Sequence, residues 1–82
     1  MKSLLQLREQ IDEIDERIMD LIEKRNQISK EIGDYKSANN LPYYQEKIAK
    51  NRSATWMSRL GFRGGLLYAT IHEISLNIQK EL

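Results

Sequence analysis

The stretch that decides the fold runs from residue 4 to residue 35 and reads LLQLREQIDEIDERIMDLIEKRNQISKEIGDY. Its apolar residues recur alternately three and four positions apart, which is the heptad spacing of a helix that packs along one seam. The residues between them are mostly charged or amide side chains, and no proline interrupts them. The seam positions are Leu4, Leu7, Ile11, Ile14, Ile18, Leu21, Arg25, Ile28, Ile32 and Tyr35. The pattern predicts one long amphipathic helix with a single charged residue in its apolar seam.

The ends of this helix carry recognisable signals. Ser3 is a suitable N-cap, and Asn39-Asn40-Leu41-Pro42 is a stop, so the helix should run from about Ser3 to about Ser37. Such a helix is roughly 50 Å long, whereas a compact domain of this size is only about 30 Å across. The helix must project beyond its own domain, and its seam then needs cover from another copy of the chain. We therefore expect an intertwined homodimer.

Two shorter helices are expected after the stop. One should run over about Tyr44–Leu60 and the other over about Leu66–Glu81, with a break at Gly61, Gly64 and Gly65 between them. Because glycines replace helix-forming residues there, the last helix should start late or be displaced. No stretch shows the alternation of a strand. The sequence thus predicts an all-α fold with three helices per chain, assembled as a helical-bundle homodimer.

Composition excludes several classes of function. The 82 residues form one small domain, residues 1–82. The chain has no cysteine and one histidine, which argues against a disulfide, a thiol nucleophile and a structural zinc site. Lys and Arg number 13 against 12 Asp and Glu, a balance unlike that of a broad basic nucleic-acid interface. No apolar run resembles a signal peptide or a membrane span, so we expect a soluble cytoplasmic protein.

Three basic residues of the first helix need an explanation. Arg25 occupies a seam position, where a buried guanidinium is costly unless paired, although it could also fix the register or extend to the rim. Lys36 points within roughly 20° of Arg25 and lies about 16 Å further along, although a lysine near a helix C-terminus is also ordinary. Arg8 lies about 25 Å from Arg25, so one small ligand could contact both only if Arg8 came from an antiparallel second copy.

The third helix offers neutral hydrogen-bonding groups. Ser75 and Gln79 lie one turn apart, although both could equally bond to water. His72 has no evident partner and is assigned a packing or surface role, and Trp56 and Tyr68 are expected to be core or rim aromatics. No nucleophile–base pair or phosphate-binding glycine loop is evident. Cations and amides that face a space between helices suit a small dianion whose reaction needs electrostatic help.

Several short motifs carry a family resemblance: LREQIDEID at 7–15, LIEKRN at 21–26, EIGDYK at 31–36, LPYYQ at 41–45, and IHEIS at 71–75 followed by Gln79. The first three resemble, in order and spacing, the first helix of the all-helical class of chorismate mutases. The fourth is similar to the family's turn into its second helix, and the last to its third-helix signature. The resemblance covers about residues 4–50 and 66–80.

The resemblance implies a fold, a reaction and a set of roles. The fold is an intertwined dimer with two active sites, each built from both chains. The reaction is the Claisen rearrangement of chorismate to prephenate in the shikimate pathway of aromatic amino-acid biosynthesis, an isomerisation that requires no metal or cofactor. The resemblance also implies a role for each site residue. Arg25 and the second copy's Arg8 bind the two carboxylates, and Ser75 helps to hold a carboxylate. Lys36 bridges a carboxylate and the ether oxygen, Gln79 binds the ether oxygen, and Gln45 lies near the ring hydroxyl.

The second helix departs from the family pattern. The family has Arg-Glu where an ungapped count gives Ile48 and Ala49, and where a one-residue deletion gives Lys47 and Ile48. The glutamate is missing either way, and Lys47 or Arg52 could supply the cation. Its loss could weaken the mutase or change the reaction. The alternatives are an isochorismate-pyruvate lyase, and a catalytically silent helical dimer that serves as a ligand-sensing or assembly module.

Overall fold

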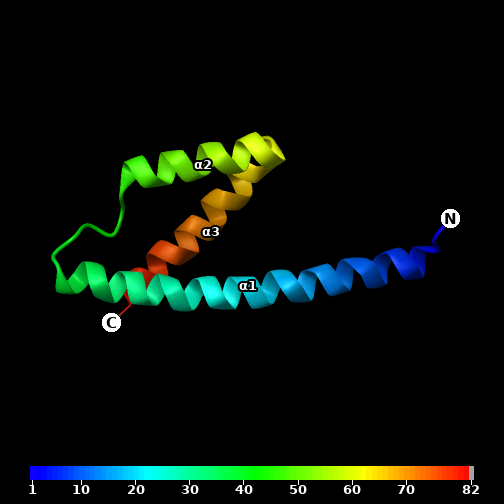
Figure 1. The fold of residues 1–82 in the computed structure, drawn as a ribbon, viewed down its shortest axis with the longest axis horizontal. Coiled ribbons are helices and arrows are strands. Elements are labelled where there is room, and N and C mark those ends of the chain that lie inside the picture. The colour runs from blue at the N-terminus through cyan, green and yellow to red at the C-terminus, as the bar shows by residue number, and fades with distance from the viewer. Residues whose placement is uncertain (82) are drawn as a thin grey trace.

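The computed structural model describes residues 1–81, which contain three helices and no strand. These are α1 (Leu4–Ala38), α2 (Glu46–Leu60) and α3 (Phe62–Lys80). In Figure 1, α1 and α2 lie on opposite sides, and α3 crosses from the end of α2 to the C-terminal half of α1. The prediction of one very long and two shorter helices is therefore confirmed for the described residues.

Both ends of α1 form as their sequence signals predict. Ser3 is the N-cap in a capping box, because its Oγ accepts a hydrogen bond from the Gln6 backbone N–H while Gln6 Oε1 accepts one from the Ser3 N–H. At the other end, Asn39 Nδ2 donates to the Tyr35 carbonyl at 2.9 Å, and Asn40 adopts a φ of 55° that helps to turn the chain. The predicted ends of this helix are confirmed to within one residue.

The second helix begins later than expected. The prediction placed its start near Tyr44, but Pro42 and the residues after it form a non-helical link, and α2 starts at Glu46. Gln45 still has extended backbone angles, with φ −122° and ψ 100°. This link crosses from the end of α1 to the start of α2 and so sets the separation between the two helices (Figure 1).

The third helix begins at Phe62, so the predicted late start at Leu66 was wrong. Gly61 alone reverses the chain, with a φ of 74° that glycine adopts without strain. Gly64 is buried in the helix, and a Cβ there would lie 2.9 Å from the carbonyl carbon of Trp56. The glycine therefore allows close contact between α3 and α2 and does not break the helix.

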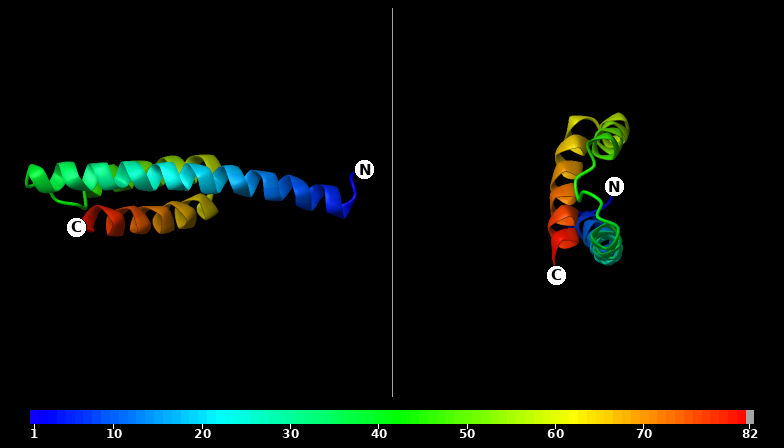
Figure 2. Two further views of the ribbon diagram at one scale, coloured as in Figure 1. Left: turned by 90° about the horizontal axis from the view of Figure 1, so that it is seen from below. Right: turned by 90° about the vertical axis from the view of Figure 1, so that its left-hand side faces the viewer.

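The single chain has almost no core of its own. α3 packs against both α1 and α2, which do not contact each other, and the N-terminal half of α1 projects beyond them (Figures 1 and 2). The described chain measures 56 × 26 × 12 Å, and its radius of gyration is 16.1 Å, against about 12 Å for a compact domain of this length. Among the described residues, only Ala49 and Tyr68 are buried hydrophobic residues. None of the helices in that range has the length and hydrophobicity of a membrane span.

Candidate active site

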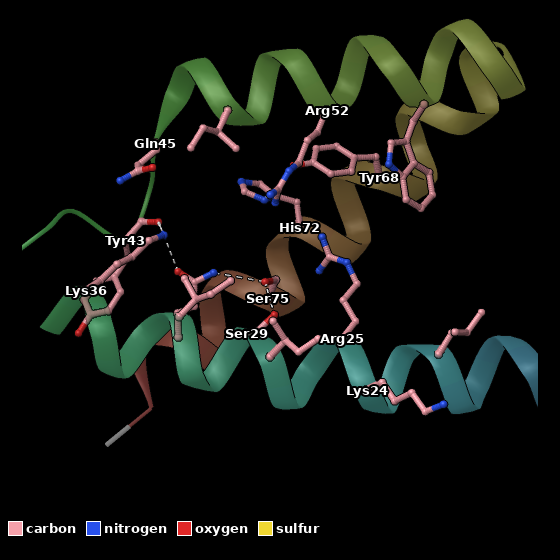
Figure 3. Close-up of a pocket in the computed structure, with 16 residues that line it drawn as sticks. Lys24, Arg25, Ser29, Lys36, Tyr43, Gln45, Arg52, Tyr68, His72 and Ser75 are labelled. Carbon is pink, nitrogen blue, oxygen red and sulfur yellow. Dashed lines mark hydrogen bonds between the residues drawn. The ribbon is translucent and has the colours of Figure 1, made fainter. Parts of the chain in front are cut away.

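A large cavity lies between α1 and α2. It has a volume of about 760 Å³. Side chains from α3 line one side of it (Figure 3). Four cationic side chains line it: Lys24, Arg25 and Lys36 from α1, and Arg52 from α2. No aspartate or glutamate is among its lining residues. The cavity therefore favours an anionic ligand, because nothing in its lining neutralises these charges.

Lys36 is held at one end of the cavity by two hydrogen bonds. Its Nζ donates to the carbonyl oxygen of Tyr43 and to Oε1 of Gln79, each at 2.7 Å. An ammonium has three N–H donors, so one remains for a ligand. Burial, and then the charge of Arg52, lower the pKa of Lys36 below its ordinary value. A bound anion would offset both effects and favour the charged amine.

A buried chain of hydrogen bonds joins α1 to α3 next to Lys36. Gln79 Nε2 donates to Ser75 Oγ at 3.3 Å, and Ser75 Oγ lies 2.6 Å from Ser29 Oγ, where either hydroxyl can be the donor. When Ser29 donates, the Ser75 hydroxyl proton is free for a ligand, and the second amide hydrogen of Gln79 is free in either case. Sequence reasoning did not select Ser29, whose position one turn before Gly33 gives no chemical signal by itself.

Gly33 makes this arrangement possible. It is buried in α1, and a Cβ there would lie 2.6 Å from Cα of Gln79 and 2.8 Å from the carbonyl carbon of the same residue. No ordinary carbon contact is so short. The missing side chain therefore lets the backbones of α1 and α3 cross closely, which brings Gln79 within hydrogen-bond distance of Lys36.

An aromatic cluster lines the cavity where α2 meets α3. The rings of Trp56 and Tyr68 are tilted with their centroids 5.6 Å apart, and His72 stacks on Tyr68 at 5.3 Å. His72 Nδ1 lies 3.3 Å from the Tyr68 hydroxyl oxygen, whereas Nε2 is buried and has no partner among the described residues. Burial, then the charges of Arg25, Arg52 and Lys36, lower the pKa of His72.

Sequence analysis gave His72 only a packing or surface role, but the structure brings it into the cavity. Its spacing from Ser75 and Gln79 could have indicated this, because residues separated by three and seven positions share a helix face. Lys24 was missed as well, and it lines the cavity one residue before Arg25. Trp56 and Tyr68 are core or rim aromatics as expected, because Tyr68 is buried and Trp56 half-buried.

Five of the seven candidate residues come together in this cavity, and two do not. Those in the lining are Arg25, Lys36, Gln45, Ser75 and Gln79. Arg8 is exposed on the projecting part of α1 and does not line this cavity, so its expected action on a second copy stays a prediction. Lys47 lies outside and lines a separate shallow hollow on α2, where its neighbour Lys50 forms an ion pair with Glu46 at 2.9 Å.

The structure shows which cationic side chain of α2 lines the cavity. Arg52, and neither Lys47 nor Lys50, is the cationic residue of α2 that lines the cavity. Ile48 lines it too, and Ala49 is buried outside its lining. The wall where the family pattern has a glutamate is therefore aliphatic. No group of three histidine, cysteine or acidic side chains in residues 1–81 is placed to hold a metal ion.

Comparisons with known proteins identify the family. The chorismate mutase type II family matches residues 7–60, so the chain belongs to this family, and the resemblance found in its motifs is confirmed. The bifunctional chorismate mutase/prephenate dehydratase of Aquifex aeolicus (strain VF5) is 46% identical over 44 residues, which are 54% of this chain and 12% of that relative. No solved structure gave a significant match. The family match ends with α2, so α3 and its site residues lie outside it.

Proposed function

We propose that this chain is a chorismate mutase, an isomerase that converts chorismate to prephenate. The observation that carries the proposal is a cavity lined by four cationic side chains and no carboxylate, in a member of the chorismate mutase type II family. Chorismate carries two carboxylates and is a dianion. A volume of about 760 Å³ is within the usual range for sites that bind small molecules.

The two carboxylates are assigned to arginines on opposite walls. Arg25 reaches the cavity from α1 and Arg52 from α2 (Figure 3). A guanidinium can bind a carboxylate through two parallel hydrogen bonds, which fixes orientation as well as charge. Arg8 of a second copy would add a third guanidinium, and Gln45 would contact the ring hydroxyl. Held in this way, the substrate keeps the compact conformer in which the carbon atoms that bond lie near each other.

The rearrangement itself needs charge stabilisation at one atom. The ether C–O bond breaks while a C–C bond forms, and because cleavage runs ahead, negative charge builds on the ether oxygen. Lys36 has one free N–H and Gln79 one free amide hydrogen for that oxygen. Both would interact more strongly with the transition state than with the substrate, which is what accelerates a reaction. No proton is transferred, so the lack of a carboxylate in the lining is no obstacle.

The active protein is proposed to be a homodimer with shared sites. The support is the exposed seam of α1, where Ile11, Ile14 and Ile18 are 58%, 54% and 50% exposed. Covering the exposed half of each such side chain stabilises an assembly by about 1 kcal/mol, roughly half of the value for full burial. Arg8 lies on the same projecting half, so an antiparallel second copy that covers the seam would carry its own Arg8 toward the cavity of the first.

A second candidate is an isochorismate-pyruvate lyase, and the observation that favours it is Ile48. This aliphatic side chain lines the cavity in the region where the family pattern has a glutamate. A lyase would release pyruvate from isochorismate and leave salicylate, while a mutase would keep all atoms of its substrate. The products separate the two readings.

The test uses Lys36→Met, which removes the ammonium but keeps most of the side-chain volume. Loss of a donor to a developing oxyanion costs about 10²–10³ in kcat, and we expect a loss of this size for chorismate. Lys30→Met is the matched control, because Lys30 is exposed on α1 and is not among the residues that line this cavity. Equal activity of the wild type and Lys36→Met would contradict the assignment.

A further inference from the structure

His72 is a polar residue of the cavity to which the proposed reaction gives no role. Its Nε2 is the only buried side-chain nitrogen or oxygen atom in residues 1–81 that has no hydrogen-bond partner. A buried polar atom without a partner carries a desolvation cost, so such atoms usually mark a site for a missing group. The position of His72 in the lining of the cavity makes a ligand the natural candidate.

The imidazole is held in a fixed orientation. It stacks on the Tyr68 ring with an angle of 18° between the planes, and the ring of Tyr44 lies against it with centroids 5.9 Å apart. Nδ1 is occupied by the Tyr68 hydroxyl, so Nε2 is the nitrogen left for a ligand. Figure 3 shows His72 between Arg25 from α1 and Arg52 from α2, the two groups proposed to hold carboxylates.

Among the described residues, the charged groups that shift the pKa of His72 are all positive. Arg25 and Lys36 face it from α1 and Arg52 from α2, and the aromatic groups against it, Tyr44 and Tyr68, are neutral. Burial and these three charges hold the pKa of His72 below its ordinary value, so the imidazole of the free protein gains its proton only at lower pH than an ordinary histidine. A dianion bound by the same arginines would offset the positive charges and raise that pKa.

We propose that His72 is a ligand-binding residue of this cavity, whose Nε2–H donates to one of the two carboxylates that Arg25 and Arg52 hold, and whose ring takes up a proton when the dianion binds. In the neutral ring, the Tyr68 hydroxyl donates to Nδ1, and after proton uptake Nδ1–H donates to the hydroxyl oxygen. Arg52 and Tyr44 are exposed, so both side chains have room to shift when a ligand binds. The inference takes the ligand's chemistry, a cyclic dicarboxylate, from the proposed function.

The experiment is calorimetric titration of the whole protein with a stable oxabicyclic dicarboxylate, in paired buffers of different ionisation enthalpy. Between about pH 5.5 and about pH 8, where histidine titrates, the wild type should take up a proton on binding. Its affinity should rise toward low pH, with a slope that approaches about tenfold per pH unit. His72→Gln keeps a donor but cannot titrate, so it should lose both the uptake and the slope. His72→Phe should bind roughly 10- to 100-fold more weakly, as expected for a lost hydrogen bond to a charged group.

Two further variants keep the test decisive if a substitution at His72 disturbs folding. Tyr68→Phe keeps the stacked ring but removes the hydroxyl, so binding should weaken while proton uptake persists. Asn77→Ala is the control, because Asn77 is exposed on α3 and lines no cavity. Circular dichroism checks that each variant is folded.

The proposal is overturned if His72→Gln retains the wild-type proton uptake and slope. That result, together with turnover of chorismate, would leave the proposed function standing. Proton uptake that depends on His72, in a protein that does not turn over chorismate, would support this inference and contradict the proposed function.

Discussion

Gly33→Ala should damage the site through the backbone alone. The added Cβ would lie 2.6 Å from Cα of Gln79 and 2.8 Å from its carbonyl carbon, and no side chain there can move aside. Carbon atoms in contact are about 3.5–4.0 Å apart, so α1 and α3 must separate by about 1 Å. The 2.7 Å hydrogen bond between Lys36 Nζ and Gln79 Oε1 would then be stretched beyond a useful length.

Gly33→Ala should lower both the activity and the stability of the protein. A displacement of about 1 Å can cost about 100-fold in rate, and we expect kcat/KM for chorismate to fall by that order. Overpacking costs about 1–3 kcal/mol, and the gain in helix propensity from Gly to Ala returns about 1 kcal/mol. A net loss of about 1 kcal/mol lowers the Tm of a domain of this size by about 4–8 °C.

Gly65→Ala is the matched control for this substitution. It is the same change in a helix, but its Cβ would meet only Cγ and Sδ of Met57, at 3.0 Å and 3.2 Å, and that flexible side chain can shift. Gly65→Ala should keep the wild-type rate and unfold at an equal or higher temperature. The reasoning is refuted if Gly33→Ala matches the wild type in initial rates of chorismate loss and in thermal unfolding followed by circular dichroism.

Three further predictions concern charge and assembly. Burial and the charge of Arg52 lower the pKa of Lys36, so Lys36 loses its positive charge at lower pH than a free lysine does. Because kcat/KM reports the free enzyme, kcat/KM should fall on the alkaline side at a pH below the ordinary lysine pKa. Arg52→Met should move this fall to higher pH, and an unchanged pH profile would argue against the coupling. Mixing inactive Arg25→Ala and Arg8→Ala chains should restore activity, because each heterodimer has one intact site, and no recovery would rule out shared sites. Ile14→Asp should place charge in the α1 seam, and sedimentation should then show loss of the folded dimer, whereas an unchanged dimer would place the interface elsewhere.

The long helix could be predicted from local signals, but the role of the glycines could not. The spacing of the α1 seam and the Ser3 cap depend only on neighbours within one helix, so the sequence contains them in full. Gly64 looks like a breaker in the sequence, yet it lies inside α3 because the space of a side chain is taken by the backbone of α2 at Trp56. A glycine that breaks a helix and one that permits close packing give the same local pattern, and only the neighbouring helix distinguishes them.

The candidate site could be predicted where its residues lie on one face of the same helix. Lys36 lies on the same face as Arg25, and Gln79 on the same face as Ser75, so spacing alone aligned each pair. The choice between Lys47 and Arg52 depended on the rotation of α2 about its axis, since residues five apart differ by about 140° in direction. The spacing of His72 from Ser75 and Gln79 places it on their helix face, but its three cationic neighbours come from other helices, so the sequence alone did not show the charge around it.

The central claim is that the cavity between α1 and α2 rearranges chorismate. The most direct test is to incubate the folded protein with chorismate and to identify the product by chromatography. We expect prephenate to form faster than in buffer alone, and Lys36→Met to lower that rate by about 10²–10³ while Lys30→Met leaves it unchanged. A folded, dimeric protein that leaves chorismate unchanged would contradict it, and release of pyruvate from isochorismate by that protein would identify the lyase instead.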